Sequence, residues 1–213
     1  MKCDKKDLLL YGVTDRAWLD GRDLADVVEQ SIRGGVTMVQ LREKDLEPAA
    51  FLAEAKRIRE VCRRHGVPFL IDDDVELALE VGADGVHVGQ SDMEAGAARA
   101  RVGQDMLLGV SAQTVEQAVR AQAAGADYLG VGAVFPTGTK TDAEAVPFDT
   151  LKAICAAVDI PVVAIGGIGP DNVDRLAGSG ICGVAVVSAL YAQQDPCAAA
   201  ERLLQKVRAA VES

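Results

Sequence analysis

The feature that most constrains the fold of this chain is the regular alternation of short apolar runs with amphipathic stretches along its length. The apolar runs have the length of β-strands, and the stretches between them carry apolar residues at helical spacing, as in residues 24–32. Eight runs alternate with eight helical stretches, which predicts an α/β fold whose parallel sheet closes into a (β/α)8 TIM barrel. The predicted strands are residues 8–13, 37–42, 68–72, 84–88, 106–111, 127–132, 161–165 and 182–187.

A single domain is predicted over residues 1–213, because no Pro/Ser-rich linker, charge block or low-complexity segment divides the chain. Hydrophobic residues make up 49% of the sequence and aromatic residues only 4%, so we expect an aliphatic core of Val, Leu, Ile and Ala. That composition is typical of parallel strands whose two faces are both covered, as they are in a helix-wrapped barrel.

A weak internal repeat marks the expected turns of this barrel. Four glycine-led triplets each end a predicted helix and lead into strand two, four, six or eight. They are Gly34-Gly35-Val36, Gly82-Ala83-Asp84, Gly125-Ala126-Asp127 and Gly180-Ile181-Cys182. Glycine is expected just past a helix end, where the backbone turns left-handed. We therefore interpret the repeat as the helix-to-strand turn, a structural feature.

The net charge of −10 argues against a nucleic-acid-binding protein, which needs a basic surface, so an anionic ligand would require a local group of cations. The five cysteines are scattered and odd in number, which favours reduced thiols over a disulfide framework or a zinc site. No apolar run has transmembrane length, and the N-terminus lacks a signal-peptide pattern. We expect a cytoplasmic protein without a membrane partner; a homo-oligomer is compatible with the sequence.

The active site of such a barrel is expected where the strands end and their following loops begin. After strand two, Gln40 and Arg42 face the same side because side chains alternate along a strand, and Lys44 extends that line. An Arg and a Lys aimed into a barrel mouth indicate a phosphate or diphosphate grip. The alternative is that Arg42 forms a simple ion pair with Asp72 or Asp73.

Carboxylates follow the next two strands, at Asp72-Asp73-Asp74 and at Asp92. Facing the cations of strand two, they suggest a Mg²⁺ site that bridges to a diphosphate, because Mg²⁺ is usually bound by one or two carboxylates together with substrate phosphates. The structural alternative is that Asp74 and Asp92 cap helices; we favour it for Asp74 and leave it open for Asp92. His87 is interpreted as a satisfied strand histidine.

The later strands end in residues suited to a second anion site. Ser111 either donates to a ligand or caps the helix that begins near Thr114. The loop at residues 132–141 is the longest connection from a strand to a helix. We expect it to wrap a phosphate and to act as a lid. Gly166-Gly167, together with the end of strand eight, matches the place where barrels often bind phosphate through backbone N–H groups.

No Ser-His-Asp or Cys-His constellation is visible, since His65 and His87 are the only histidines. Covalent catalysis is therefore disfavoured. The sequence predicts chemistry driven by a departing phosphate group whose charge is stabilised.

Six separated motifs resemble, in the same order, the pattern of the thiamine phosphate synthase family, and the resemblance covers essentially the whole chain. They are Gln40-Leu41-Arg42-Glu43-Lys44, Asp72-Asp73, His87-Val88-Gly89-Gln90-x-Asp92, Gly109-Val110-Ser111, Pro136-Thr137-x-Thr139-Lys140 and Gly166-Gly167-Ile168. The resemblance implies a barrel enzyme that joins a pyrimidine diphosphate to a thiazole phosphate and releases pyrophosphate. Pyrophosphate leaves first in that family, and the thiazole nitrogen then captures a pyrimidine cation.

The resemblance also implies a role for each matching residue. The pyrimidine diphosphate would be bound by Gln40, Leu41, Arg42, Glu43, Lys44, Asp72, Ser111 and Lys140, of which Arg42, Lys44, Ser111 and Lys140 would be catalytic. Mg²⁺ would be held by Asp73 and Asp92. The thiazole phosphate would be held by Thr137, Gly138, Thr139, Gly167, Val187 and Ser188.

Two positions depart from the family pattern. Asp72 stands where the family more usually has Asn, and a carboxylate there repels diphosphate unless it joins the metal or pairs with a cation. Gln113 stands where His is common.

Three alternative functions stay open. A thiazole tautomerase-like paralogue would need no metal, and a phosphosugar isomerase or epimerase would share only the phosphate site of the last two strands. A non-catalytic thiamine-precursor binding protein would bind without turnover.

Overall fold

Parallel pairing of eight short strands closes the sheet into a barrel in chain order, with β8 hydrogen-bonded back to β1. This computed structural model describes residues 3–138 and 145–212. The strands are β1 Leu10–Val13, β2 Met38–Leu41, β3 Phe69–Asp72, β4 Gly85–Val88, β5 Leu107–Ala112, β6 Tyr128–Val131, β7 Val162–Ile165 and β8 Gly183–Val186. Each lies within two residues of its predicted range, so the predicted barrel is confirmed.

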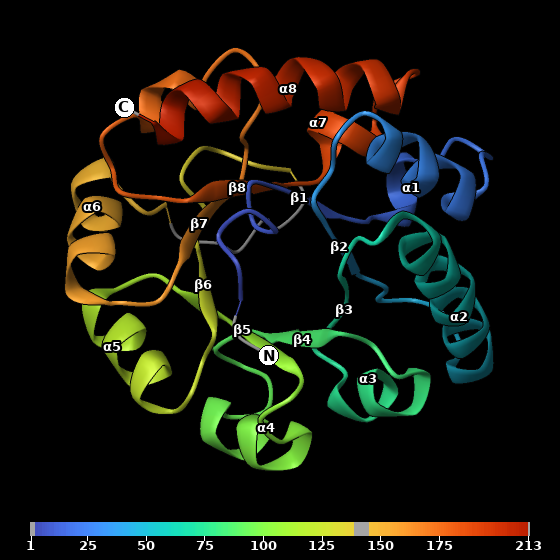
Figure 1. The fold of residues 1–213 in the computed structure, drawn as a ribbon, viewed down its shortest axis with the longest axis horizontal. Coiled ribbons are helices and arrows are strands. Elements are labelled where there is room, and N and C mark those ends of the chain that lie inside the picture. Colours follow the sequence, from blue (N-terminus) through green and yellow to red (C-terminus); the bar gives the residue numbers. More distant parts are fainter. Residues whose placement is uncertain (1–2, 139–144, 213) are drawn as a thin grey trace.

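Helices form a ring around the outside of the barrel (Figure 1). They are α1 Leu24–Arg33, α2 Pro48–His65, α3 Val75–Val81, α4 Ala95–Val102, α5 Val115–Ala123, α6 Phe148–Ala157, α7 Ser188–Tyr191 and α8 Pro196–Val211, with 3₁₀ helices η1 Arg16–Trp18 and η2 Val173–Leu176. The predicted strict alternation is wrong at one place, because β7 and β8 are joined by the four-residue η2 and not by an α-helix. That connection is rich in Gly and includes Pro170, which disfavours an α-helix.

Alternation of side chains along the strands divides the apolar residues into two cores. Leu107 of β5 faces the barrel interior, where it belongs to one buried cluster with Tyr11, Met38 and Leu70. Its neighbour Leu108 faces the opposite way and joins the larger cluster between the barrel and the helices. The interior is therefore filled, and a ligand can reach only the ends of the strands.

The N-terminal end of the barrel carries the glycine turns that the repeat predicts. Gly35, Gly82, Gly125 and Gly180 all have positive φ, at 105°, 64°, 94° and 92°. This conformation suits glycine because it lacks a Cβ atom. The structural interpretation of the repeat is thus confirmed.

A buried arginine ties this end of the barrel together. Arg99 of α4 is only 8% exposed. It donates to the backbone carbonyls of Gly103, Met106 and Gly125 over 2.6, 2.8 and 3.0 Å, and it pairs with the Asp127 carboxylate. Asp127 also accepts from the Leu108 backbone N–H at 2.8 Å, so one ion pair links α4, β5 and β6.

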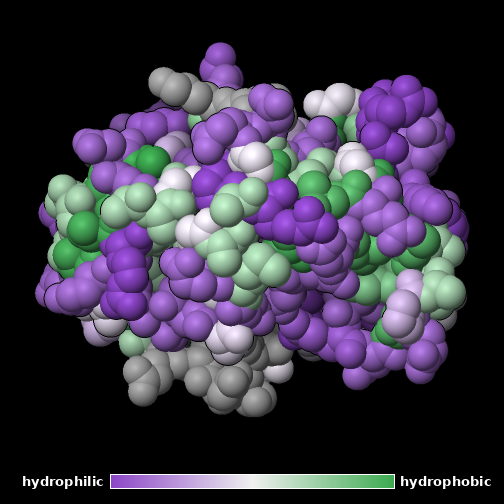
Figure 2. All heavy atoms as spheres, turned by 90° about the horizontal axis from the view of Figure 1, so that it is seen from below, coloured by the Kyte–Doolittle hydropathy of each residue, from purple (hydrophilic) through white to green (hydrophobic). Residues whose placement is uncertain are grey.

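The side of the molecule in Figure 2 is mostly hydrophilic, with smaller hydrophobic areas between the polar residues. Among the described residues, none of the helices combines the length and the apolar character that crossing a membrane requires. All five cysteines lie in the described part of the chain as free thiols, as expected from their scatter.

Removal of the buried guanidinium is expected to destabilise the fold strongly. Arg99→Ala leaves three carbonyls and the Asp127 carboxylate without their donor, so the free energy of unfolding should fall by about 3–5 kcal/mol. Arg101→Ala on the same helix removes only an exposed pair with Glu76 and should change it little. Urea unfolding of both variants checks this, and equal losses would contradict it.

Candidate active site

The ends of β2, β3 and β4 and the loops that follow them form the mouth of the barrel. Gln40 points into the barrel and is 4% exposed, whereas Leu41 points outward into the packing against the helices. Any contact of Leu41 with a ligand would therefore come from its backbone. The Glu43 carboxylate is nearly buried and pairs with Arg16 at 2.9 Å, which places it beside the mouth as a structural partner.

Arg42 and Lys44 meet the predicted carboxylates. Arg42 lies 3.8 Å from Asp72 and donates to Asp15 at 3.1 Å. Lys44 contacts Asp73 and lies 3.7 Å from Asp72. The ion-pair alternative for Arg42 is thus present in this structure, although its hydrogen-bonded partner is Asp15. The sequence analysis did not single out Asp15. It follows β1, so the expectation that site residues follow the strand ends could have identified it.

Asp72 is a largely buried carboxylate of the mouth, with a side chain that is 13% exposed. Burial and, to a smaller extent, the Asp73 carboxylate raise the pKa of Asp72 to about 7, although Lys44 and Arg42 oppose this rise. The cations therefore compensate only part of the cost of a charge at this position. A neutral Asn at this position would avoid that cost.

Asp73 and Asp92 come together from neighbouring strand ends. Burial raises the pKa of Asp92, and a hydrogen bond with Asp73 raises it further. Asp73 has φ of 62°, a conformation that is rare outside glycine, and its backbone N–H donates to the His87 carbonyl at 2.8 Å. Such backbone strain is typical of functional sites.

Asp74 caps a helix, whereas Asp92 does not. Asp74 is the N-cap of α3 and accepts from the Leu77 N–H at 2.8 Å, as favoured. The N-cap of α4 is Glu94, and Asp92 instead accepts from the Gly89 N–H at 2.7 Å. Asp92 is therefore a carboxylate of the mouth.

The charge in the mouth fits a divalent cation bound with an anion. Within the described residues, the carboxylates of Asp15, Asp72, Asp73 and Asp92 surround the cations Arg42 and Lys44. No group of three or more His, Cys, Asp or Glu side chains there is arranged to hold a metal alone. Two adjacent carboxylates, Asp73 and Asp92, match the partial ligand set with which Mg²⁺ binds substrate phosphates.

Ser111 is held by a histidine. The His87 Nε2 atom lies 2.9 Å from the Ser111 hydroxyl, and its Nδ1 atom lies 3.0 Å from the Tyr128 hydroxyl. Both ring nitrogens of His87 therefore have hydrogen-bond partners within the barrel, as predicted for a structural histidine of the strand. Thr114, and not Ser111, caps α5 by accepting from the Gln117 N–H at 3.2 Å, which leaves Ser111 as a side chain of the mouth.

The loop after β6 lies against the glycines after β7. The Phe135 N–H donates to the Gly166 carbonyl at 3.1 Å, and a Cβ atom on Gly167 would lie 2.3 Å from the Pro136 carbonyl oxygen. Gly167 thus permits a close backbone approach that other residues would prevent. Thr137 and Gly138 continue this loop, whereas Thr139 and Lys140 lie outside the described residues.

Asn172 braces the glycine loop. Its amide donates to the Gly167 carbonyl at 2.9 Å and its carbonyl accepts from the Gly169 N–H at 2.9 Å. Sequence reasoning missed this residue. Val187 and Ser188 stand at the start of α7, after β8, as the predicted phosphate site requires.

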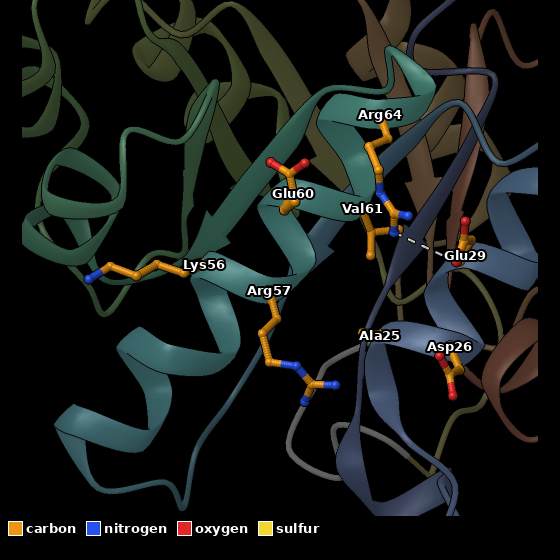
Figure 3. Close-up of a pocket in the computed structure, with 8 residues that line it drawn as sticks. All are labelled: Ala25, Asp26, Glu29, Lys56, Arg57, Glu60, Val61 and Arg64. Atoms are coloured by element: carbon orange, nitrogen blue, oxygen red, sulfur yellow. Dashed lines mark ion pairs between the residues drawn. The ribbon is translucent and has the colours of Figure 1, made fainter.

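One surface hollow lies at the mouth, and another lies on the outside of the barrel. One of about 390 Å³ is lined by Arg42, Glu43 and Lys44 together with Asp15. The other, of about 480 Å³, is an outer groove between α1 and α2 that carries Glu29, Arg57 and Arg64 (Figure 3). Its charges are paired locally, as in the contact of 3.7 Å between Glu29 and Arg64. We therefore assign the site to the mouth.

This chain is similar to known proteins over nearly its whole length. The family model for thiamine monophosphate synthase matches residues 10–190. Thiamine-phosphate synthases of Clostridium tetani and Ruminiclostridium cellulolyticum are 49% and 50% identical over 197 and 201 residues, which cover 92% and 94% of this chain and 94% and 96% of the relatives. The solved thiamine phosphate pyrophosphorylase from Pyrococcus furiosus has a TM-score of 0.89 at 36% identity and covers 97% of this chain and 98% of its own.

Burial of Asp72 predicts a stability effect that depends on pH. Its pKa is raised from 3.8 when unfolded to about 7 when folded, so wild-type stability falls as pH rises through this window. Asp72→Asn does not titrate, and its advantage over wild type should grow by about 2–3 kcal/mol between pH 5 and pH 8. Unfolding in EDTA at both pH values measures this. An advantage that is constant or shrinks with pH would contradict the assignment.

Proposed function

We propose, because this chain belongs to the thiamine monophosphate synthase family, that it is a transferase that makes thiamine phosphate. Its substrates would be 4-amino-2-methyl-5-(diphosphooxymethyl)pyrimidine and 4-methyl-5-(2-phosphoethyl)thiazole or the carboxylated form of that thiazole phosphate. The products are thiamine phosphate and pyrophosphate. The observation that carries this proposal is the meeting of Arg42 and Lys44 with Asp72, Asp73 and Asp92 at one end of a closed barrel.

The pyrimidine diphosphate occupies the side of the mouth formed by β2 to β5. Arg42 and Lys44 exchange part of their contact with Asp15 and Asp72 for the diphosphate oxygens, which are better acceptors for a paired Arg and Lys grip. Gln40 and Ser111 lie on the inner wall beneath them. Lys140 adds a further cation from the loop after β6 in this proposal.

Mg²⁺ is the proposed metal, with Asp73 and Asp92 as its protein ligands. When bound, it supplies positive charge to the departing diphosphate. The residues of the chain favour such an ion, because adjacent Asp73 and Asp92 carboxylates repel each other and repel a diphosphate without it. Lys44 also pairs with Asp73 and would help to hold this carboxylate in place for the ion.

The thiazole phosphate occupies the opposite side of the mouth. Thr137, Gly138 and Thr139 come from the loop after β6, Gly167 from the loop after β7, and Val187 and Ser188 from the start of α7. Hydroxyl groups and backbone N–H groups suit a monophosphate, and glycine lets the backbone approach it closely. Asn172 keeps the Gly167 loop in place.

The proposed reaction is dissociative. The bond between the pyrimidine methylene carbon and the diphosphate oxygen breaks first, and the electron pair leaves with pyrophosphate. The thiazole nitrogen then donates its electron pair to the methylene carbon of the resulting cation and forms the new C–N bond. Arg42, Lys44 and Lys140 stabilise the leaving charge, and both substrates held side by side supply effective molarity of up to about 10⁵–10⁸ M in favourable cases.

Incubation of the purified protein with both substrates and Mg²⁺ tests the proposal directly. Thiamine phosphate and pyrophosphate should form in equal amounts. Isomerisation of the thiazole without pyrophosphate release would indicate a tautomerase, and tight binding without turnover would indicate a binding protein; both results contradict the proposal.

Arg42→Ala should lower kcat by about 10³-fold or more, because a charged donor to the leaving group is lost. The barrel should stay folded, since Arg42 lies at a strand end. Arg57→Ala in the outer groove is the matched control and should retain normal turnover (Figure 3). Near-normal activity of Arg42→Ala would refute its role.

Asp73→Ala and Asp92→Ala should each lower kcat by about 10²-fold or more, because each removes a ligand of the same ion. The double variant should cost little more than the more damaging single change, since groups that act as a unit are not additive. Steady-state turnover at saturating Mg²⁺ measures the three losses. Losses that multiply in the double variant would count against a shared metal.

A further inference from the structure

A chain of polar side chains crosses the inside of the barrel beneath the mouth. We call it the polar chain; it consists of Gln40, Tyr11, Tyr128, His87 and Ser111. The Gln40 amide donates to the Tyr11 hydroxyl at 2.6 Å, and the Tyr11 and Tyr128 hydroxyls lie 2.9 Å apart. His87 then joins Tyr128 to Ser111 over 3.0 and 2.9 Å. The polar chain thus links β2, β1, β6, β4 and β5.

Packing fixes the members of the polar chain. Tyr11 and Tyr128 are 1% and 0% exposed, and their rings meet edge to face with centroids 6.0 Å apart. A Cβ atom on Gly109 would lie 2.2 Å from the Tyr128 ring and 2.4 Å from His87 Nδ1. Glycine at position 109 therefore makes the room in which Tyr128 and His87 meet.

The donors and acceptors give the polar chain a direction. Because Gln40 donates to the Tyr11 oxygen, Tyr11 has its own hydrogen left for Tyr128. If Tyr11 donates that hydrogen to Tyr128, the Tyr128 hydroxyl donates its own to His87 Nδ1, which is then unprotonated.

The direction of the last hydrogen bond, between His87 and Ser111, follows from the direction of the earlier ones. A neutral imidazole with a bare Nδ1 carries its proton on Nε2, so His87 donates to the Ser111 oxygen. The Ser111 hydroxyl hydrogen is then directed away from His87. Burial raises the pKa of both Tyr11 and Tyr128, which keeps both phenols protonated and able to donate.

We propose that the polar chain fixes Ser111 as a hydrogen-bond donor to the pyrimidine diphosphate, with Tyr11, Tyr128 and His87 as positioning residues. This inference rests on the proposed function for the identity of the acceptor. A serine hydroxyl alone rotates and can either donate or accept, whereas a hydrogen bond from His87 to the Ser111 oxygen keeps the hydroxyl hydrogen available for donation to a ligand. A donor oriented before the reaction stabilises developing negative charge without reorganisation.

The tautomer of His87 tests the direction without any substrate. The chain has only two histidines, so ¹⁵N NMR of wild type and of His65→Gln assigns the His87 ring. The Nε2-protonated tautomer is expected in both. In Tyr128→Phe, the Nδ1 atom loses its donor and the Nε2-protonated signal should weaken. An Nδ1-protonated ring in wild type would mean that the hydrogen bonds run in reverse, with Ser111 donating to His87, and would overturn the proposal.

Kinetics test whether Tyr128 acts through Ser111. Tyr128→Phe should lower kcat by about 10-fold and leave both KM values within about 3-fold, because a preoriented donor is loosened and binding contacts stay. In a Ser111→Ala background the same change should have no further effect on kcat, since the group that it orients is gone. Equal losses in both backgrounds would show a merely structural role and would overturn the proposal.

Two further variants complete the experiment. Tyr191→Phe removes another fully buried phenol hydroxyl, on α7 outside the polar chain, and should leave kcat unchanged. Tyr11→Phe breaks the polar chain one step earlier and should repeat the pattern of Tyr128→Phe if that variant does not fold. Absence of turnover in wild type would contradict the proposed function, while the tautomer measurement would still decide the direction of the polar chain.

Discussion

The balance of charge in the mouth is the constraint on which the rest of the site depends. Asp72, Asp73 and Asp92 come together with only Arg42 and Lys44 to offset them among the described residues. Burial makes this costly, as the raised pKa of Asp72 shows. In the proposed function, a diphosphate and a divalent ion that enter together would lower this cost, because the ion would neutralise the carboxylates and the diphosphate would pair with Arg42 and Lys44. On that proposal, the mouth is preorganised for its ligands at some cost in the stability of the fold.

The packed interior of the barrel supports this charged mouth. Apolar side chains occupy the lower part, and the polar chain lies between them and the charged rim. Each hydroxyl and ring nitrogen named in the polar chain has a partner, so polar groups are buried without the cost of unmet hydrogen bonds. The helices packed around the barrel hold the strand ends at fixed distances. The polar side chains are therefore also held in place, because they project from these strands.

Much of the fold was predictable because periodicity and glycine turns are local. The eight strands follow from apolar runs, and the error between β7 and β8 arose because Gly and Pro weaken a helix in ways that spacing alone does not show. Strand ends also located Arg42, Lys44 and the aspartates. By contrast, the contact between Tyr11 and Tyr128 joins β1 to β6 across the barrel and leaves no local sign in the sequence. Likewise, only the structure shows that Glu94 caps α4 and leaves Asp92 to the mouth.

The most direct test of the account is the binding of a divalent ion in the mouth. Mn²⁺ can replace Mg²⁺ as a paramagnetic probe, and its free concentration can be followed by EPR as protein is added with or without the pyrimidine diphosphate. The account predicts that one ion binds per chain when the diphosphate compound is present and that binding is much weaker in its absence. If no ion binds even with that compound at saturation, the central claim is contradicted.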